Sequence, residues 1–573
     1  MMKTPHQAPE VAPQKRLTGP RSALGLLMLA ALAFSLLWPQ DHFWGKPEAW
    51  RMVFWNYPEQ IETIRTALQA NQYRQPAVHG VRGSIPVIYH PFHVWIYQLL
   101  LCLTSEPTAL VLIKQSLTLV PCLLGLAYLA RALAWPAHPV LLFFFSPFLY
   151  AYGRQLSDDP WLIPLSLLAF CCYARFYRRR KWPAAVAGLA ALILMFFTHP
   201  RGLPPALAML VLFLLLEYRW VKKRARPVLL VLALALVVTV PTLLDLHRQI
   251  NPSAEACPAS TADSVRAALP PTDPGPISRL NLIFPLISGG LFFSYDFMTL
   301  FPETVPWSVW LPKPLVRALV AVSMAAYLLI IIGLWLTASR LVSFWRGRRP
   351  PDLADRIGLI CLAMVILQLA QTAVVLALKK FSPPDYHLGV WFCYFFFIWR
   401  AMGFFSRGGR GRLLPPVYLT AMAVLWVNMV LTVHVRSDFN LGQAVRLAKD
   451  LAGHSPQSDI VLLVDFTAEA GRELQALETR ADQVLMGFYY GPYLRETRGF
   501  IDKMRRHRSN LLSYALYPLT LHYRQAAGGT TNQTPRTLLI KWEEGSLPRR
   551  LILVDDPEAV FQKPCPLNLA PNF

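Results

Sequence analysis

Long apolar segments alternate with short basic segments along most of this chain. Most of the apolar segments are long enough to cross a hydrocarbon layer of about 30 Å as a helix. The chain should therefore be a polytopic α-helical membrane protein. The pattern predicts about 11 transmembrane helices, at residues 22–38, 108–131, 138–151, 160–178, 183–198, 203–219, 227–244, 315–338, 357–378, 387–405 and 413–434.

Three segments, one of them among the predicted spans, fit the pattern less well. Residues 93–104 and 138–151 are short for a crossing, so either could form a partial helix instead. The stretch 281–310 has Pro and Gly between aromatic residues, which is typical of interfacial or re-entrant backbone. Such backbone occurs at membrane depth only where protein or a water-filled cavity satisfies its polar groups.

Positive charge marks one side of the predicted membrane domain. The 573 residues carry a formal net charge of +23, and 54% of them are hydrophobic. The basic residues flank apolar segments, which favours a topology signal over a nucleic-acid partner. If residues 1–21 are cytoplasmic, the inner loops are 175–181, 219–226, 340–356 and 400–412, each rich in Lys and Arg.

This orientation puts loops 39–90 and 245–314 on the outer face, together with the chain from residue 435 onward. The predicted membrane domain covers residues 22–434. C-terminal to it, charges of both signs are mixed and no long apolar run occurs. Strand-like and helix-like patterns alternate over residues 435–573, which predicts a soluble α/β domain of roughly 140 residues. The predicted strands are 459–465, 483–490, 538–542 and 551–554, and the predicted helices are 467–480 and 493–513.

A pair of carboxylates, Asp158 and Asp159, lies in the short outer gap between two predicted spans. Ionisable groups beside a bilayer are costly and usually functional. Asp159 precedes Pro160 and could simply cap the next helix, but Asp158 is not needed for that cap. We expect at least one of the two to act in the site, with Arg154 nearby.

The first outer loop supplies a second acidic pair, Glu59 and Glu62. The apolar residues around them share one helical face, so this segment should form a helix on the membrane surface with both carboxylates on its polar side. Asn56 followed by Glu59 also resembles a capping box, which offers a structural alternative for Glu59.

Short motifs recur in a particular order along residues 20–435. Tyr-His-Pro-Phe-His-Val-Trp-Ile-Tyr (89–97) is followed by Ser-Pro-Phe-Leu-Tyr (146–150), the aspartate pair, Thr-His-Pro-Arg-Gly (198–202) and Asp-Tyr-His-Leu (385–388). This order resembles that of GT-C-type glycosyltransferases, which include protein O-mannosyltransferases and lipid A aminoarabinose transferases. The class usually has Asp where this chain has Asn56, so Glu59 or Glu62 would substitute, or the chain is an inactive relative.

The resemblance implies a membrane glycosyltransferase that uses a polyprenyl-phosphate sugar, with inversion, on the outer face of a bacterial inner membrane. The acceptor would be a hydroxyl of a lipid, glycan or protein, and the C-terminal domain would be periplasmic. Glu59, Asp158 or Asp159 would be the general base. The substrate-binding candidates are Asn56, Glu62, His90, Arg154, His199, Arg201, Lys379, Tyr386 and His387.

Other interpretations remain open for some of these residues. Lys379 also fits a side chain that snorkels at a helix end. A divalent cation is a candidate cofactor with His90 and His93 among its ligands, although both histidines also fit interfacial packing. The competing functions are a transporter or flippase of a lipid-linked glycan, for which no matched repeats are visible, and a catalytically inactive membrane assembly protein, which Asn56 favours.

Overall fold

The computed structural model describes the chain in separate stretches, most of them helical. Isolated positions between 25 and 31, at 149 and between 228 and 240 are also described. The continuous stretches are 91–104, 107–147, 161–226, 289–295, 310–346, 350–377, 384–407, 412–436, 460–465, 536–542 and 551–555.

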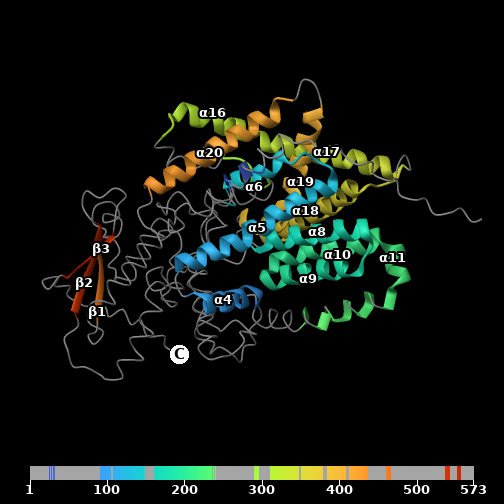
Figure 1. Cartoon of the computed structure of the whole chain (residues 1–573), viewed down its shortest axis with the longest axis horizontal. Helices are drawn as coiled ribbons and strands as arrows, with labels where there is room; N and C mark the ends of the chain where they lie inside the picture. The colour runs from blue at the N-terminus through green and yellow to red at the C-terminus, as the bar shows by residue number, and fades with distance from the viewer. Residues whose placement is uncertain are drawn as a thin grey trace, which may run out of the picture.

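The described helices pack side by side in Figure 1, with their long axes roughly horizontal. In chain order they are α4 (Pro91–Leu103), α5 (Pro107–Leu133), η1 (His138–Leu141), α6 (Leu142–Phe145), α8 (Leu162–Arg179), α9 (Trp182–Thr198), η3 (Pro200–Gly202), α10 (Leu203–Leu216), α11 (Tyr218–Lys223), α16 (Lys313–Ser323), α17 (Ala325–Trp345), α18 (Leu353–Ala377), η4 (Pro384–Val390), α19 (Trp391–Arg407) and α20 (Leu414–Arg436).

Several described helices are long and apolar enough to cross a membrane, so the chain is a multi-pass membrane protein. The expected total of about 11 stays a prediction, because residues 22–38 lie largely, and residues 227–244 partly, outside the described residues. The helices that meet both criteria of length and composition are Leu112–Leu133, Lys313–Trp345, Leu353–Val374, His387–Ser406 and Leu414–Leu431.

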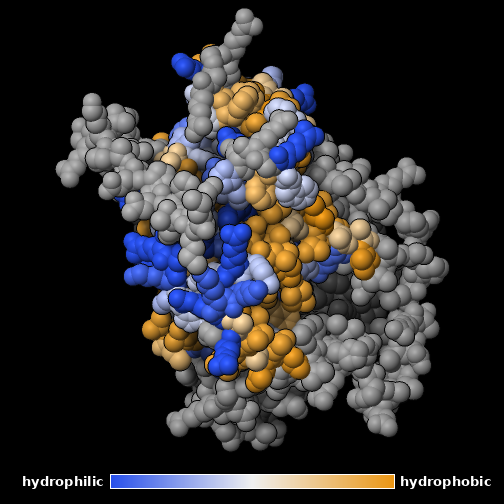
Figure 2. Space-filling view, turned by 90° about the vertical axis from the view of Figure 1, so that its right-hand side faces the viewer, coloured by the Kyte–Doolittle hydropathy of each residue, from blue (hydrophilic) through white to orange (hydrophobic). Residues whose placement is uncertain are grey.

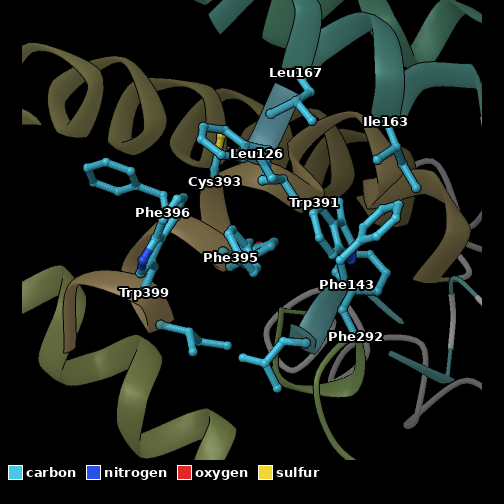
Figure 3. Packing of buried hydrophobic residues seen from close by; sticks show 14 of the residues in the cluster. Leu126, Phe143, Ile163, Leu167, Phe292, Trp391, Cys393, Phe395, Phe396 and Trp399 are labelled. Carbon is cyan, nitrogen blue, oxygen red and sulfur yellow. The ribbon is translucent and has the colours of Figure 1, made fainter. Parts of the chain in front are cut away.

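Helix α19 is the centre of the packing. It contacts α8, α17, α18 and α20, and its aromatic side chains are buried among them. Trp391, Phe395 and Trp399 follow one another at each turn, with successive ring centroids 5.3 Å apart. Figure 3 shows these rings between side chains from α5, α6 and α8. Because large rings bury much apolar area, this ladder defines the core of the described helices.

A second group of helices packs around α8. Helices α5 and α9 lie against α8, α4 lies against α9, and α10 lies against both α9 and α18. Gly125 on α5 permits one of these contacts, because a Cβ atom there would lie 3.0 Å from Leu167 on α8. The two groups of helices thus meet through α8, α18 and α19.

The predicted span 138–151 is broken in the structure. Residues His138–Leu141 form a 3-10 turn, Leu142–Phe145 form one α-turn, and Ser146 is extended with ψ 120°. Proline disfavours the helical conformation of the residue before it, and Pro147 follows Ser146. Residue 147 is helical again and residues 150–160 lie outside the described part of the chain, so the partial-helix alternative stays a prediction. Helix α4, with 13 residues, is also short for a crossing.

Residues 289–295, from the stretch predicted to be re-entrant, lie buried between the helices. Side-chain hydroxyls satisfy their backbone. Ser146 Oγ donates to the Phe292 carbonyl at 2.6 Å, and Tyr418 donates to the Phe293 carbonyl at 2.6 Å. Gly290 allows the insertion, because a Cβ atom there would lie 2.0 Å from the ring of Tyr327. Irregular backbone here is surrounded by protein, as expected.

The predicted span 315–338 is longer in the structure and has a break. Helices α16 and α17 together cover Lys313–Trp345 and meet at Met324. Ser323 Oγ donates to the Val320 carbonyl at 2.7 Å and accepts the backbone N–H of Tyr295 at 3.0 Å. A serine hydroxyl that bonds to the backbone of its own helix often bends that helix. Here it also holds the inserted segment.

A small mixed sheet is described near the C-terminus. It has the order β1–β2–β3, in which β1 (Ile460–Asp465) is parallel to β2 (Arg536–Trp542) and β2 is antiparallel to β3 (Leu551–Asp555). The strands predicted at 459–465, 538–542 and 551–554 are confirmed. The α/β domain as a whole stays a prediction, because 467–513 lies outside the described residues.

Candidate functional site

One end of the described helices is strongly basic. Exposed Lys and Arg residues there follow the ends of α8, α10 and α17, and Figure 2, which views this end, shows hydrophilic side chains gathered on it. The carboxylate of Glu217 joins the loops. It pairs with Arg180 and, at 2.6 Å, with Arg356, and it accepts the hydroxyl of Tyr173 at 3.3 Å. Three loops predicted to share the inner side therefore meet.

A cleft of about 590 Å³ also opens at this basic end, lined by Trp135, Arg340, Asp352, Trp399 and Arg400 among others. Its guanidinium groups already have carboxylate partners. Arg400 lies 3.4 Å from Asp355, and Arg340 lies 3.9 Å from Asp352. These pairs neutralise the cleft, which makes it a poor site for an anionic phosphate.

Two short turns meet at the opposite end of the helices. Turn η3 links α9 to α10, and η4 leads into α19; the two turns contact each other. They carry four residues that were predicted to bind substrate, since His199 and Arg201 belong to the first turn and Tyr386 and His387 to the second. The structure thus brings together residues that lie far apart in the sequence.

Turn η3 is held by hydrogen bonds from its own backbone. His199 ends α9, and its carbonyl accepts the N–H of Gly202 at 2.8 Å. Its ring Nδ1 accepts the N–H of Arg201 at 3.1 Å. Gly202 packs so closely that a Cβ atom there would lie 2.4 Å from the carbonyl oxygen of Met195. The Thr-His-Pro-Arg-Gly sequence therefore specifies a tight turn.

This geometry also sets the protonation of the neutral His199 ring. A nitrogen that accepts a hydrogen bond carries no hydrogen, so the proton of the neutral imidazole is on Nε2. The partly buried Arg201 lies two residues further along the chain. An imidazole N–H and a guanidinium fork are both suited to phosphate oxygens.

His387 is fully buried in η4 and connects this turn to α18. Its Nε2 lies 3.3 Å from the hydroxyl of Thr372, which itself donates to the Gln368 carbonyl at 2.9 Å. The hydroxyl therefore accepts a hydrogen from Nε2. Among the described residues no partner reaches His387 Nδ1. The role that this ring has in the structure is to hold η4; direct contact with substrate stays a prediction.

Lys114 is a buried charge that the sequence analysis missed. It belongs to the predicted span 108–131, where Lys114, Gln115 and Thr118 on α5 are all buried and Lys114 has no exposed surface. A lone lysine two turns inside an apolar run was the available signal. Intramembrane ionisable residues mark functional sites more often than not.

The remaining predicted site residues cannot be placed. The side chain of Tyr386 is not described, and no group of three or more His, Cys, Asp or Glu suited to a metal occurs among the described residues. The predicted residues that lie outside the described part of the chain are Asn56, Glu59, Glu62, His90, Arg154, Asp158, Asp159 and Lys379.

Comparison with solved structures finds low similarity. The crystal structure of ArnT from Cupriavidus metallidurans in the apo state is 14% identical, with a TM-score of 0.42 over 91% of this chain and 93% of that one. The same protein bound to undecaprenyl phosphate is 14% identical, with a TM-score of 0.37 over 95% of this chain and 99% of that one. Curated protein sequences contain no match to this chain.

The comparison with protein families gives a match inside the membrane domain. Residues 86–244 match the family model of dolichyl-phosphate-mannose-protein mannosyltransferases. The matched segment contains Lys114 and the η3 turn with His199 and Arg201. The resemblance to membrane glycosyltransferases is thereby confirmed at the level of this family: residues 86–244 carry its pattern.

Proposed function

We propose that this protein transfers a sugar from a polyprenyl-phosphate donor to an acceptor hydroxyl on the outer face of the membrane. The observation that carries the proposal is the family match over residues 86–244. The family is named for dolichyl-phosphate mannose, which is a sugar on a polyprenyl phosphate. The matched residues also include a turn whose side chains suit a phosphate group.

The chemistry is a single displacement with inversion. The bond between sugar C1 and the phosphate oxygen breaks, and its electron pair stays on the phosphate, which is a stable anion. The acceptor oxygen forms the new bond to C1 while its proton passes to a carboxylate base. We assign the base to Glu59, Asp158 or Asp159.

The leaving phosphate needs positive charge and hydrogen-bond donors, because its negative charge grows during the reaction. Arg201 and His199 are suited to this role from η3. His387 would act indirectly, by holding η4 against α18 beside that turn. This arrangement supports a donor site at the end of the helices opposite the basic loops.

The proposed orientation of the protein in the membrane follows from the positive-inside rule. The basic loops that meet at Glu217 would be cytoplasmic, so the η3 and η4 turns would face outward. In a bacterium this corresponds to the inner membrane with residues 435–573 in the periplasm. That domain would help to orient the acceptor, which is a lipid, a glycan or a protein.

Purified full-length protein in lipid nanodiscs should be tested with a radiolabelled polyprenyl-phosphate mannose and a cell-envelope extract as acceptor. Removal of a positioned base typically lowers the rate by about 10²–10⁴-fold. One or more of Glu59→Gln, Asp158→Asn and Asp159→Asn should therefore show such a loss, whereas Arg131→Gln, an exposed charge at the far end of α5, should not.

Full activity in all three carboxylate variants would contradict the assignment of the base. If the unaltered protein leaves this donor and the corresponding glucose and aminoarabinose donors intact, the proposed function itself is wrong.

A further inference from the structure

An apolar groove runs between α8, α9 and α10 and ends at α11, on the basic side of the described helices. Figure 1 shows these four helices together, and Figure 2 shows hydrophilic side chains beside apolar ones at that end. Among the described residues no charged side chain lines the groove. Its volume of about 60 Å³ is far below the 590 Å³ of the cleft beside Arg400, so the groove admits a slender chain and not a bulky group.

Aromatic rings surround the mouth of the groove. Trp182 at the start of α9 stacks on Trp220 of α11, with ring centroids 5.5 Å apart. Phe176 near the end of α8 meets the Trp220 ring at 4.8 Å and the Phe213 ring of α10 at 5.2 Å. All four rings line the groove. Tryptophan is enriched where a membrane meets water, so the stacked pair puts the mouth at the membrane surface.

The groove continues from this mouth into the depth of one leaflet. On α9 its lining extends from Trp182 to Leu192, a rise of about 15 Å along the helix. On α8 it extends from Phe176 back to Ala169, again away from the basic loops. A hydrocarbon layer is about 30 Å thick, so one leaflet is about 15 Å thick. The length of the groove therefore matches that of a lipid acyl chain in its own leaflet.

A guanidinium group without a carboxylate partner lies at this mouth. Arg224, directly after α11, is exposed, and its guanidinium carbon lies 5.3 Å from the centroid of the Trp220 ring. Arg180 lies in a similar way over the ring of Phe176, at 5.4 Å, but it pairs with Glu217. Among the described residues no carboxylate pairs with Arg224. Its charge is therefore available to an anion beside the groove.

We propose that this groove binds one acyl chain of an anionic phospholipid, whose phosphate contacts Arg224. A guanidinium fork matches phosphate oxygens, and basic pockets between transmembrane helices bind the head groups of anionic lipids. The exposed Arg219 and Lys223 of α11 add positive charge beside the head group. This charge disfavours a lipid whose head group carries its own ammonium. The site is independent of sugar transfer, because it lies at the end of the helices opposite η3 and η4.

A binding experiment on the full-length protein tests the role of the charge. Purified protein in a neutral detergent is titrated with phosphatidylglycerol and with phosphatidylcholine of the same acyl chains, and both affinities are measured by native mass spectrometry. The unaltered protein should prefer phosphatidylglycerol. Arg224→Gln should lower this preference about five-fold, which is the contribution of one cation near a membrane surface. Arg346→Gln removes a charge from the same end of the bundle, after α17, and should leave the preference unchanged.

A second pair of variants tests the groove itself. Ala185 lines the groove on α9, so Ala185→Phe should fill it and weaken binding of both lipids about ten-fold, with their ratio unchanged. Ala187 is exposed on the same helix and is not part of the lining. Ala187→Phe adds the same ring outside the groove and should change neither affinity. If Ala185→Phe does not fold, Ala185→Leu answers the same question with a smaller side chain.

Three results would overturn the proposal. Equal affinity of the unaltered protein for the two lipids would exclude recognition of an anionic head group. An equal loss of preference in Arg346→Gln and Arg224→Gln would assign the preference to the basic end as a whole. Unchanged lipid affinities in Ala185→Phe would exclude the groove; if that variant also changes the number of copies in the complex, a helix of a second copy occupies the groove instead.

Discussion

Single charged residues hold together parts of the chain that are far apart. Glu217 is 4% exposed and accepts hydrogen bonds from groups on α8 and α18, although it lies at the end of α10. Arg356 also stacks over the ring of Tyr177, 5.0 Å from its centroid. Such a cluster leaves unpaired charges behind when one member is removed.

Glu217→Gln should therefore destabilise the protein more than a surface change does. The substitution keeps the shape of the side chain but leaves the guanidinium of Arg356, which is 17% exposed, without its anion. We expect a loss of about 3 kcal/mol in the free energy of unfolding, measured by denaturant titration in detergent. Lys222→Gln, an exposed change on α11, is the control. An equal midpoint for both variants would contradict the importance of this cluster.

At the scale of secondary-structure elements, small residues decide how closely the helices approach. Helix α17 packs against the central α19 at Gly333, where a Cβ atom would lie 2.0 Å from the carbonyl oxygen of Phe397. No rotation of a side chain relieves that contact, because the obstacle is backbone. The separation of the two helices therefore depends on glycine.

Gly333→Ala should push α17 away from α19 and disturb the packing of the α19 rings Trp391, Phe395 and Trp399. Overpacking of this kind typically costs about 1–3 kcal/mol, which should lower the thermal midpoint measured by tryptophan fluorescence. Gly188→Ala on α9 is a matched control, because its new methyl group would meet only Cys172 Cβ at 3.3 Å. A larger loss in the control variant would refute this account of the contact.

At the scale of the whole molecule, the described helices have one basic end and one end with short polar turns. Figure 2 views the basic end, where exposed Lys and Arg residues follow α8, α10 and α17. The turns η3 and η4 lie at the other end, and so does the start of α8. This polarity is the basis for an outward-facing site.

Labelling of introduced cysteines tests this polarity. Lys222→Cys at the basic end should react with a membrane-impermeant maleimide only after cells are permeabilised. Trp310→Cys, exposed just before α16, should react in intact cells. The labelling of each variant is compared with that of the unaltered protein, which already has cysteines. Labelling of Lys222→Cys in intact cells would contradict the proposed orientation. The site would then lie on the cytoplasmic side.

Much of the helical framework could be predicted, because hydropathy is a local property of the sequence. The predicted spans 160–178, 183–198 and 413–434 agree closely with the helices Leu162–Arg179, Trp182–Thr198 and Leu414–Arg436. The basic loops were also predicted to share one side. These features follow from the cost of charge in lipid and from helix length.

The site was predictable only in part. The motif at 198–202 lies between two predicted spans, which the sequence shows, and the structure has the turn η3 there; the substrate-binding role of Arg201 stays a prediction. The sequence did not reveal that His387 bonds to Thr372, that Lys114 is buried or that Glu217 joins three loops. Each of these depends on side chains from different helices.

The sequence by itself thus determined the membrane class and the approximate helices, because the lipid environment acts on each segment separately. Tertiary structure alone decided that residues 289–295 insert among the helices and that η3 meets η4. The insertion depends on the close approach at Gly290, and the two turns approach at Gly389 of η4, where a Cβ atom would lie 3.9 Å from the Arg201 carbonyl oxygen of η3. Packing between distant segments is a property of the assembled bundle, so no local pattern specifies which buried polar groups meet.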